Sequence, residues 1–254
     1  YFAYDSKKSG GATMSHLRFG DQPIRSTYLI DEADYIGCHV QAYVNQYDVL
    51  KGLRKGGNFV LNCIWTEEEL ESKLPAKMKR FIAENEINLY TINATKIATE
   101  IGLGRRINMI MQSAFFKLAE IIPEDEAKDY LKASIKKAYG KKGDKVVNMN
   151  FEAVERGMNS LVKINVPASW KDAEDSEVVE TKKITDFVKN IMNPMNALEG
   201  DKLPVSAFNG IEDGTFPAGT AAYEQKYQNG KLQNVFNVTN VLLFVHMHVL
   251  DQFL

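Results

Sequence analysis

Residues 58–92 read NFVLNCIWTEEELESKLPAKMKRFIAENEINLYTI, and this stretch decides the expected fold. It opens with an apolar run over 58–65 and closes with a second one over 87–92. Between the two runs, Thr66 and Glu69 can form a capping box, in which each side chain accepts a hydrogen bond from the other residue's backbone N–H. The order strand, helix, strand is that of a βαβ unit, which joins parallel strands.

The helical part of this unit carries a proline at position 75. Proline has no N–H and its ring clashes with a preceding carbonyl inside a helix, so we expect a kink or a split there. The apolar residues on both sides of it form one stripe, which predicts the face buried against the sheet: Leu70, Leu74, Met78, Phe81 and Ile82.

The flanking sequence continues the alternation of strands and helices. Upstream, we expect strands over 15–19 and 34–40, and a helix over 45–55 whose buried face carries Tyr47, Leu50 and Leu53. Downstream, we expect helices over 94–100, 108–122, 125–139 and 150–162. Residues 1–166 therefore predict an α/β domain with a mainly parallel sheet flanked by helices. The acidic and then proline-containing residues 167–225 predict an extended linker.

The composition excludes several classes of protein. The 254 residues include 31 Lys and Arg against 33 Asp and Glu, a formal net charge of −2, whereas nucleic-acid binding normally needs a basic excess. No apolar stretch reaches the roughly 18 to 20 residues that span a bilayer, and no signal peptide opens the chain, so we expect a cytoplasmic protein without a membrane partner. Because Tyr1 lies inside a candidate strand, we expect an internal piece of a longer protein.

Isolated cysteine and histidine residues are best interpreted first as structural. Cys38 and Cys63 lie among apolar residues of candidate strands, and we expect them to be buried thiols. Two cysteines are too few for a disulfide scaffold or a complete structural zinc site. His16 and His39 lack the spacing of metal ligands and are expected to be satisfied structural histidines.

Two short stretches combine glycine with basic residues, a composition that suits phosphate groups. Residues 7–11 read KKSGG, and residues 102–106 read GLGRR directly before the expected helix over 108–122. Glycine lets the backbone approach a ligand closely, and a helix N-terminus attracts anions. A solvated turn and a plain helix cap are the simpler interpretations, since the second stretch lacks the third glycine of a dinucleotide-binding fingerprint.

Four segments, YDSKKSGG at 4–11, SHLRFG at 15–20, RINMIMQ at 106–112 and DGTFP at 213–217, carry a family resemblance. Together they resemble the gamma domain of pyruvate:ferredoxin (flavodoxin) oxidoreductase, a multidomain enzyme. The resemblance implies a cytoplasmic, homodimeric parent of anaerobic metabolism that converts pyruvate and coenzyme A to acetyl-CoA and CO2, with electrons passing to ferredoxin or flavodoxin. It also implies thiamine diphosphate, Mg2+ and [4Fe-4S] iron-sulfur clusters, all in other domains, so this fragment alone is expected to bind none of them and to be inactive.

In the family that this chain resembles, the gamma domain helps to hold coenzyme A. The resemblance assigns Lys8, with Lys7 as the alternative register, to the phosphates of coenzyme A. It assigns Asn108 and Asn150 to polar contacts with the adenine or pantetheine group, because an amide both donates and accepts. No catalytic and no metal-binding residue is expected. Two alternatives stay open: the gamma component of another 2-oxoacid:ferredoxin oxidoreductase, and a non-catalytic module for coenzyme A binding or assembly.

Residues 226–254 depart from the family, which continues into a ferredoxin-like domain with the motif C-x2-C-x2-C-x3-C-P. Asn-Val pairs begin here at positions 234, 237 and 240, and a Phe-Val pair begins at 244, with the spacing of those cysteines. The codons AAT or TTT followed by GTN contain TGT, a cysteine codon, in a shifted frame. We therefore expect an out-of-frame tail; the rival interpretations are an amphipathic helix over 235–250 and a metal site at His246 and His248.

Overall fold

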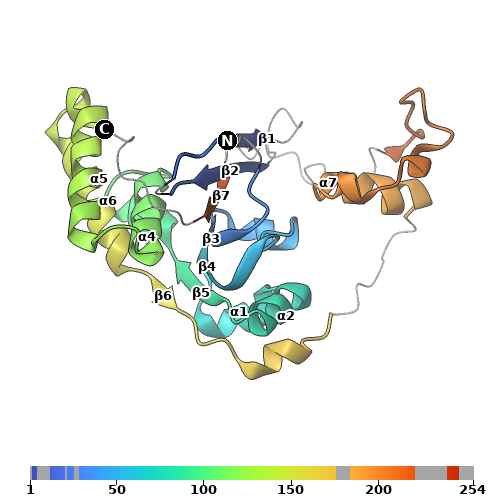
Figure 1. Cartoon of the computed structure of the whole chain (residues 1–254), viewed down its shortest axis with the longest axis horizontal. Coiled ribbons are helices and arrows are strands. Elements are labelled where there is room, and N and C mark those ends of the chain that lie inside the picture. The colour runs from blue at the N-terminus through green and yellow to red at the C-terminus, as the bar shows by residue number, and fades with distance from the viewer. Residues whose placement is uncertain are drawn as a thin grey trace.

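The structure is a computed structural model that describes residues 2–4, 12–20, 22–25, 29–175, 184–220 and 239–245. Its centre is one twisted sheet with the strand order β1-β2-β7-β3-β4-β5-β6 (Figure 1). The strands are β1 (Phe2–Tyr4), β2 (Ala12–Arg18), β3 (Ala33–Cys38), β4 (Leu53–Asn62), β5 (Asn88–Ile92), β6 (Val162–Lys163) and β7 (Thr239–Val245).

The middle of the sheet is parallel. β3 pairs with β4 and β4 pairs with β5 in parallel, and β2 pairs in parallel with β7. Antiparallel pairs join β1 to β2, β7 to β3 and β5 to β6. The predicted α/β fold with a mainly parallel sheet flanked by helices is thus confirmed.

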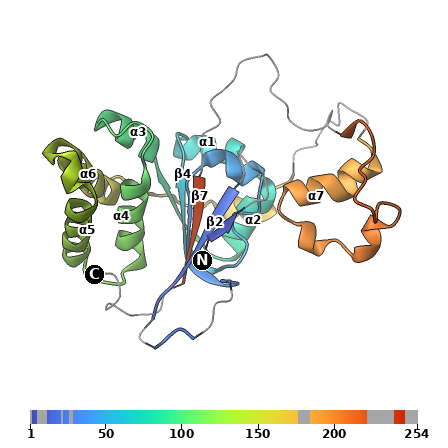
Figure 2. The same cartoon turned by 90° about the horizontal axis from the view of Figure 1, so that it is seen from above.

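Helices cover both faces of the sheet, as Figure 2 shows with the sheet seen nearly edge-on. One face carries α1 (Glu67–Lys73) and α2 (Ala76–Glu84), and the other carries α3 (Ala94–Glu100), α4 (Asn108–Ala119), α5 (Glu124–Tyr139) and α6 (Asp144–Asn159). Each face has its own core, with Phe59, Leu61 and Leu70 in the first and Val60, Ile110 and Phe115 in the second. Alternation along β4 supplies both cores, because successive side chains of a strand point to opposite faces.

The βαβ unit forms as predicted. The N–H of Thr66 donates to Oε2 of Glu69 at 2.9 Å, and the N–H of Glu69 donates to Oγ1 of Thr66 at 3.3 Å, which completes the capping box. Pro75 separates α1 from α2. The apolar stripe is buried at Leu70, Leu74, Met78 and Ile82, while Phe81 is half-buried.

The helix predicted over 45–55 is wrong. A short 3-10 helix covers Gln41–Asn45, turns follow, and β4 already begins at Leu53. Gly52 explains the break, because its φ of +82° is a left-handed conformation and a Cβ there would lie 2.5 Å from the carbonyl oxygen of Asp31. The apolar spacing reflected burial of loop residues, since Leu50 and Leu53 still join the first core.

Other element bounds shift without changing the fold. The last helix of the domain starts at Asp144 and not at 150, directly after Gly143 with φ +91°. The first turn of α6 reads DKVV, in which only Val147 is buried, so it offers little apolar pattern to extend the predicted helix. The helix predicted over 108–122 ends at Ala119, where Glu120 adopts a left-handed conformation with φ 48°.

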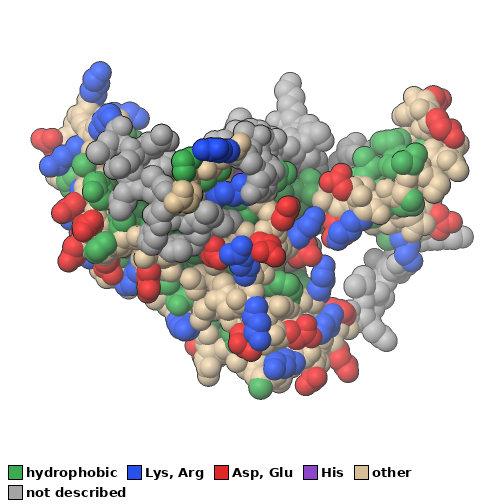
Figure 3. Space-filling view, in the orientation of Figure 1, with side chains coloured by type: hydrophobic (Ala, Val, Ile, Leu, Met, Phe, Trp, Pro, Cys, Tyr) green, Lys and Arg blue, Asp and Glu red, His purple; other side chains and the backbone are tan. Residues whose placement is uncertain are grey.

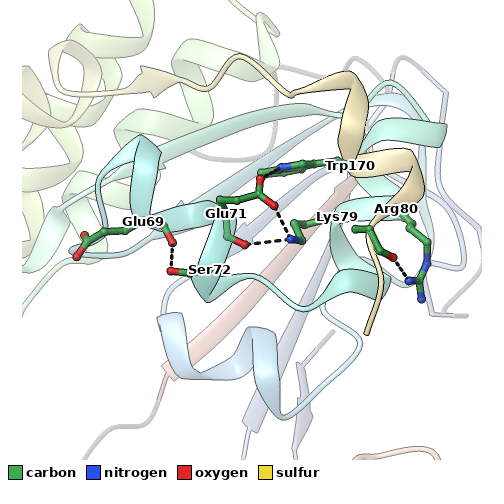
Figure 4. A network of polar contacts seen from close by, with 7 residues as sticks. Glu69, Glu71, Ser72, Lys79, Arg80 and Trp170 are labelled. Atoms are coloured by element: carbon green, nitrogen blue, oxygen red, sulfur yellow. Dashed lines mark hydrogen bonds and ion pairs between the residues drawn. The ribbon is translucent and has the colours of Figure 1, made fainter. Parts of the chain in front are cut away.

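Residues 167–225, which the sequence predicts to be a linker and which are called the linker below, contact the α/β domain at their start. A 3-10 helix over Ala168–Asp172 buries Trp170, whose indole N–H donates to the carboxylate of Glu71 (Figure 4). Lys79 Nζ donates to the carboxylate of Glu71 at 2.8 Å and to its backbone carbonyl at 3.0 Å. Arg80 adds bonds to the carbonyl of Ala173 and, at 3.0 Å, to Asp175. These contacts, called the Trp170 clamp below, fix residues 168–175 against α1 and α2.

Further along, the linker forms short elements only. They are a π-helical stretch, Val188–Met192, the short helix α7 (Asn193–Asn196), and single turns at Gly200–Lys202 and Val205–Phe208. On the face seen in Figure 3, acidic and basic side chains are interspersed over the domain. Over the residues that the structure describes, no helix has the length and apolar character needed to cross a membrane.

Candidate functional site

The carboxyl ends of β3, β4 and β5 lie side by side and form an edge that we call the carboxyl edge. Asn62 ends β4, and its side chain joins the neighbouring strand ends. Its Nδ2 donates to the carbonyl oxygen of His39 at 2.8 Å, and its Oδ1 accepts from the N–H of Ala94 at 2.9 Å. Asn62 is buried, so these bonds satisfy an amide that would otherwise be costly there. In open α/β sheets, ligands bind outside this end of the strands.

The helix α4 begins at the same edge. Its last turn lies over the start of β3 and β4, where Asn58 Nδ2 donates to the carbonyl of Leu118 at 3.2 Å. One turn earlier, the ring of Phe115 lies 5.2 Å from that of Tyr35. A helix of this length extends about 18 Å, and Figure 2 shows α3, which follows the carboxyl end of β5, at its other end, so the first turn of α4 lies toward the carboxyl edge. The free N–H groups of α4 are thus directed where an anion would bind.

The GLGRR stretch forms the loop that leads into this helix. Gly102 and Gly104 have φ values of 86° and 63°, and Leu103 is buried, which anchors the loop. Arg105 and Arg106 are exposed and form no ion pair within the described part of the chain. Two exposed cations beside the N-terminus of a helix give this loop a local positive potential, which favours an anion.

The structure places the predicted site residues unequally. Lys7 and Lys8 lie outside the described residues. Asn108 is the first residue of α4 and is exposed. Asn150 is buried in α6, where its Nδ2 donates to the carbonyl of Val146 at 2.8 Å, so this donor is engaged within its own helix.

Helix α6 nevertheless approaches the loop that precedes Asn108. A Cβ on Gly102 would lie 3.2 Å from Sδ of Met149, the residue before Asn150. β2 also starts at this edge, because Ala12 pairs with Thr239 of β7 while Cys38 pairs with Val241 of the same strand. The segment that carries Lys7 and Lys8 directly precedes Ala12 in the chain.

The cysteines are buried free thiols, as predicted. Burial raises the pKa of the Cys38 thiol to about 12 and also raises that of Cys63, so neither is a reactive thiolate at neutral pH. His16 has a structural contact, because its Nδ1 accepts from the N–H of Ile30 at 3.2 Å.

The prediction that His39 is a satisfied histidine is wrong. Its Nε2 is enclosed and has no hydrogen-bond partner among the described residues, although its carbonyl oxygen binds Asn62. Burial lowers the pKa of His39 to about 4, so the imidazole is neutral at neutral pH. Within the described residues, no group of three or more His, Cys, Asp and Glu side chains could hold a metal ion.

Sequence reasoning missed Asn62 and misjudged His39. Both polar residues interrupt apolar runs of predicted strands, His39 near the end of DYIGCHV and Asn62 within NFVLNCIW, and that interruption is the signal that could have found them. The chain is thus an α/β domain with polar residues at the carboxyl edge of its sheet, the edge where ligands bind in open α/β sheets.

The chain belongs to the pyruvate ferredoxin/flavodoxin oxidoreductase family, whose model matches residues 1–160. A second family model, described as a domain of unknown function, matches residues 173–226. The pyruvate-flavodoxin oxidoreductase of Enterobacter agglomerans is 62% identical over 226 residues, and the pyruvate:ferredoxin oxidoreductase of Moorella thermoacetica is 56% identical over 226 residues. Each alignment covers 89% of this chain and 19% of the relative, so the chain spans about a fifth of their length.

Among solved structures, a pyruvate oxidoreductase subunit from Thermotoga maritima is similar at 17% identity with a TM-score of 0.43. That similarity covers 53% of this chain and 66% of the subunit.

Proposed function

We propose that this chain is part of an oxidoreductase that converts pyruvate and coenzyme A to acetyl-CoA and CO2, with electrons passing to ferredoxin or flavodoxin. Within that parent, the chain contributes to the binding of coenzyme A. The family membership and the names of the similar enzymes support the parent reaction. Free buried thiols at Cys38 and Cys63 fit a reducing cytoplasm.

One observation carries the binding role. The exposed Arg105 and Arg106 directly precede the N-terminus of α4, and Gly102 and Gly104 shape the loop that leads to them. Coenzyme A carries a diphosphate and a 3′-phosphate, which such a cluster of donors and cations would hold. Asn108, exposed at the start of α4, would add an amide contact, and Lys8 from the adjoining segment would add a further cation.

The chain's own residues would bind and orient, and the redox chemistry would take place elsewhere in the parent. The family resemblance assigns the iron-sulfur clusters and Mg2+ to other domains of that parent. When bound in the parent, thiamine diphosphate would supply the carbanion chemistry. We therefore propose that the fragment alone binds coenzyme A without turnover.

Calorimetric titration of the 254-residue protein with coenzyme A tests this proposal. Arg106→Gln should weaken binding about tenfold, because a hydrogen bond between charged groups contributes roughly 1.5 to 3 kcal/mol. Arg54→Gln is the matched control, since Arg54 lies at the amino end of β4 and pairs there with Glu32 and Asp34. Absence of binding by the unaltered protein, or equal losses in both variants, would refute the binding role.

We also propose that residues 226–254 are an out-of-frame tail in place of the start of a ferredoxin-like domain. Neither family model extends beyond residue 226. Of the rival helix over 235–250 the structure describes residues 239–245, which form the strand β7; His246 and His248 lie outside the described residues. Sequencing the coding DNA decides the matter: TGT at the four junctions supports the proposal, and its absence there refutes it.

A further inference from the structure

His39 lies at the carboxyl edge and is a buried polar side chain whose Nε2 has no hydrogen-bond partner among the described residues. It follows the last residue of β3 and is 8% exposed. Along β3, Ile36 and Cys38 contribute to the core under α1 and α2, whereas Tyr35 contributes to the core under α3 to α6. Continued alternation places His39 on the side of Tyr35, the face that α4 covers.

The position of His39 along that face matches the first turn of α4. Phe115 of α4 contacts Tyr35, and four residues of extended chain from Tyr35 to His39 span about 13 Å. From Phe115 back to Asn108, seven helical residues span about 10 Å in the same direction. These lengths put His39 at about the same height along the strands as the first turn of α4.

The neighbouring polar groups are already paired, which isolates Nε2. Asn62 uses its amide on His39's carbonyl oxygen and on the N–H of Ala94, and Asn93 caps α3 by accepting from the N–H of Lys96. Nε2 of His39 has no such partner among the described residues. A buried polar atom without a partner destabilises the free protein, and such groups persist where a ligand completes them.

We propose that Nε2 of His39 forms a hydrogen bond with a neutral amide of the pantetheine arm of coenzyme A, while the phosphates stay outside at Arg105 and Arg106. This inference rests on the proposed function. A neutral imidazole at a buried position suits an amide better than a phosphate, because an ion loses far more hydration energy on burial. His39 therefore contacts the uncharged pantetheine arm of coenzyme A and not its nucleotide end.

Nε2 is enclosed in this structure, so the arm reaches it only when neighbouring side chains move. The unsatisfied nitrogen lowers the stability of the free protein, and binding removes that penalty. An apolar residue at position 39 should therefore have opposite effects on stability and on affinity, a signature that a purely structural histidine does not give.

The test titrates the 254-residue protein with coenzyme A and, separately, with adenosine 3′,5′-bisphosphate, which lacks the pantetheine arm. His39→Leu should weaken coenzyme A binding at least fivefold, leave bisphosphate binding unchanged, and leave Tm equal or higher. His39→Gln and His39→Asn form the matched pair of polar variants. The Gln amide nitrogen can occupy the position of Nε2, so His39→Gln should bind within threefold of the unaltered protein, whereas His39→Asn should lose as much as His39→Leu.

Unchanged coenzyme A affinity in both His39→Leu and His39→Asn would overturn the role of His39 and leave the proposed function standing. Equal losses for both probes would also overturn it, because they would indicate general damage to the edge. Absence of coenzyme A binding by the unaltered protein would refute the proposed function, and this inference with it. If His39→Leu does not fold, the comparison of His39→Gln with His39→Asn still tests the role of His39.

Discussion

The α/β domain and the linker differ in how their positions are determined. In the domain, two cores on opposite faces of one sheet bury side chains from every strand between β3 and β5 and from all six helices. In the described linker residues 184–220, only Val188 and Ile191 are buried. The domain is therefore stabilised by the apolar surface that it buries, whereas the linker buries too little apolar surface to hold a fixed position by itself.

Two grooves lie between the linker and the domain, and they show that the linker packs loosely beyond its start. A groove of about 640 Å³ separates Ala197 and Glu199 from residues 44–52 and α2, and a second of about 260 Å³ lies between residues 197–201 and β2. At its start, in contrast, the linker buries Trp170 to 2% exposure and adds the Trp170 clamp. The linker is thus tightly held at one end and loosely packed beyond it, and five predictions test this contrast.

Gly157→Ala should have the largest effect, because it breaks the domain where α6 crosses α4. A Cβ there would lie 2.1 Å from Oγ of Ser113 and 2.6 Å from the carbonyl oxygen of Ile110. Separation of the helices should reduce the free energy of unfolding by about 3 kcal/mol or more, measured by urea denaturation. Gly140→Ala is the control, since nothing lies within 4 Å and its φ is −54°, and it should be neutral or slightly stabilising. Similar effects of both variants would contradict the close packing.

Trp170→Ala should release the start of the linker at a cost of about 3 kcal/mol, the usual effect of removing a buried aromatic side chain. Hydrogen exchange should accelerate over 168–175, while the amides of α4 and α6 remain protected. Trp170→Phe keeps most of the ring but loses the bond to Glu71, so it should cost about 1 kcal/mol. Equal acceleration throughout the domain would show that the linker is part of one cooperative unit.

Acidification should weaken the domain through His39. Its pKa is about 4 in the folded protein and 6.5 ordinarily, so between these values the unfolded chain binds more protons. Stability present above pH 6.5 should therefore fall as the pH decreases, by roughly 2 kcal/mol at about pH 4.5, since one pKa unit corresponds to about 1.4 kcal/mol. Urea denaturation across this range should show a shallower loss in His39→Leu; parallel curves would contradict the assignment.

The Trp170 clamp should respond in a lower pH range. Hydrogen bonds from Lys79 and then Trp170 lower the pKa of Glu71 below its ordinary value of 4.5. A lowered carboxylate pKa stabilises the fold above the unfolded value, and that contribution disappears as the pH falls through the folded value. Exchange of residues 168–175 should therefore increase only below about pH 4.5, after the domain has begun to lose stability.

The smallest effect should come from the capping box. Thr66→Ala removes the side chain that accepts from the N–H of Glu69, and should cost about 1 kcal/mol. Thr66→Ser keeps the hydroxyl and should cost much less. Thermal unfolding of both variants measures the difference, and equal Tm values would show that the cap contributes nothing here.

Predictions from capping, proline and periodicity were confirmed where the interacting residues lie within one short stretch of sequence. The capping box, the split at Pro75 and the helix over 94–100 each depend on residues within one or two turns, and all three are present. The helix predicted over 45–55 failed because a distant carbonyl, that of Asp31, lies against Gly52. Tertiary contact outweighed the apolar spacing there.

The order of amino acids alone predicted the βαβ pattern, the buried stripe of α1 and α2 and the family, and it proposed residues for phosphate binding that stay a prediction. The tertiary structure decided that Asn62 joins three strand ends, that α4 starts at the carboxyl edge, and that Nε2 of His39 has no partner among the described residues. The difference arises because the two kinds of feature depend on interactions at different separations along the chain. Periodicity and capping depend on neighbours along the chain, whereas burial and hydrogen-bond pairing depend on residues brought together from distant segments.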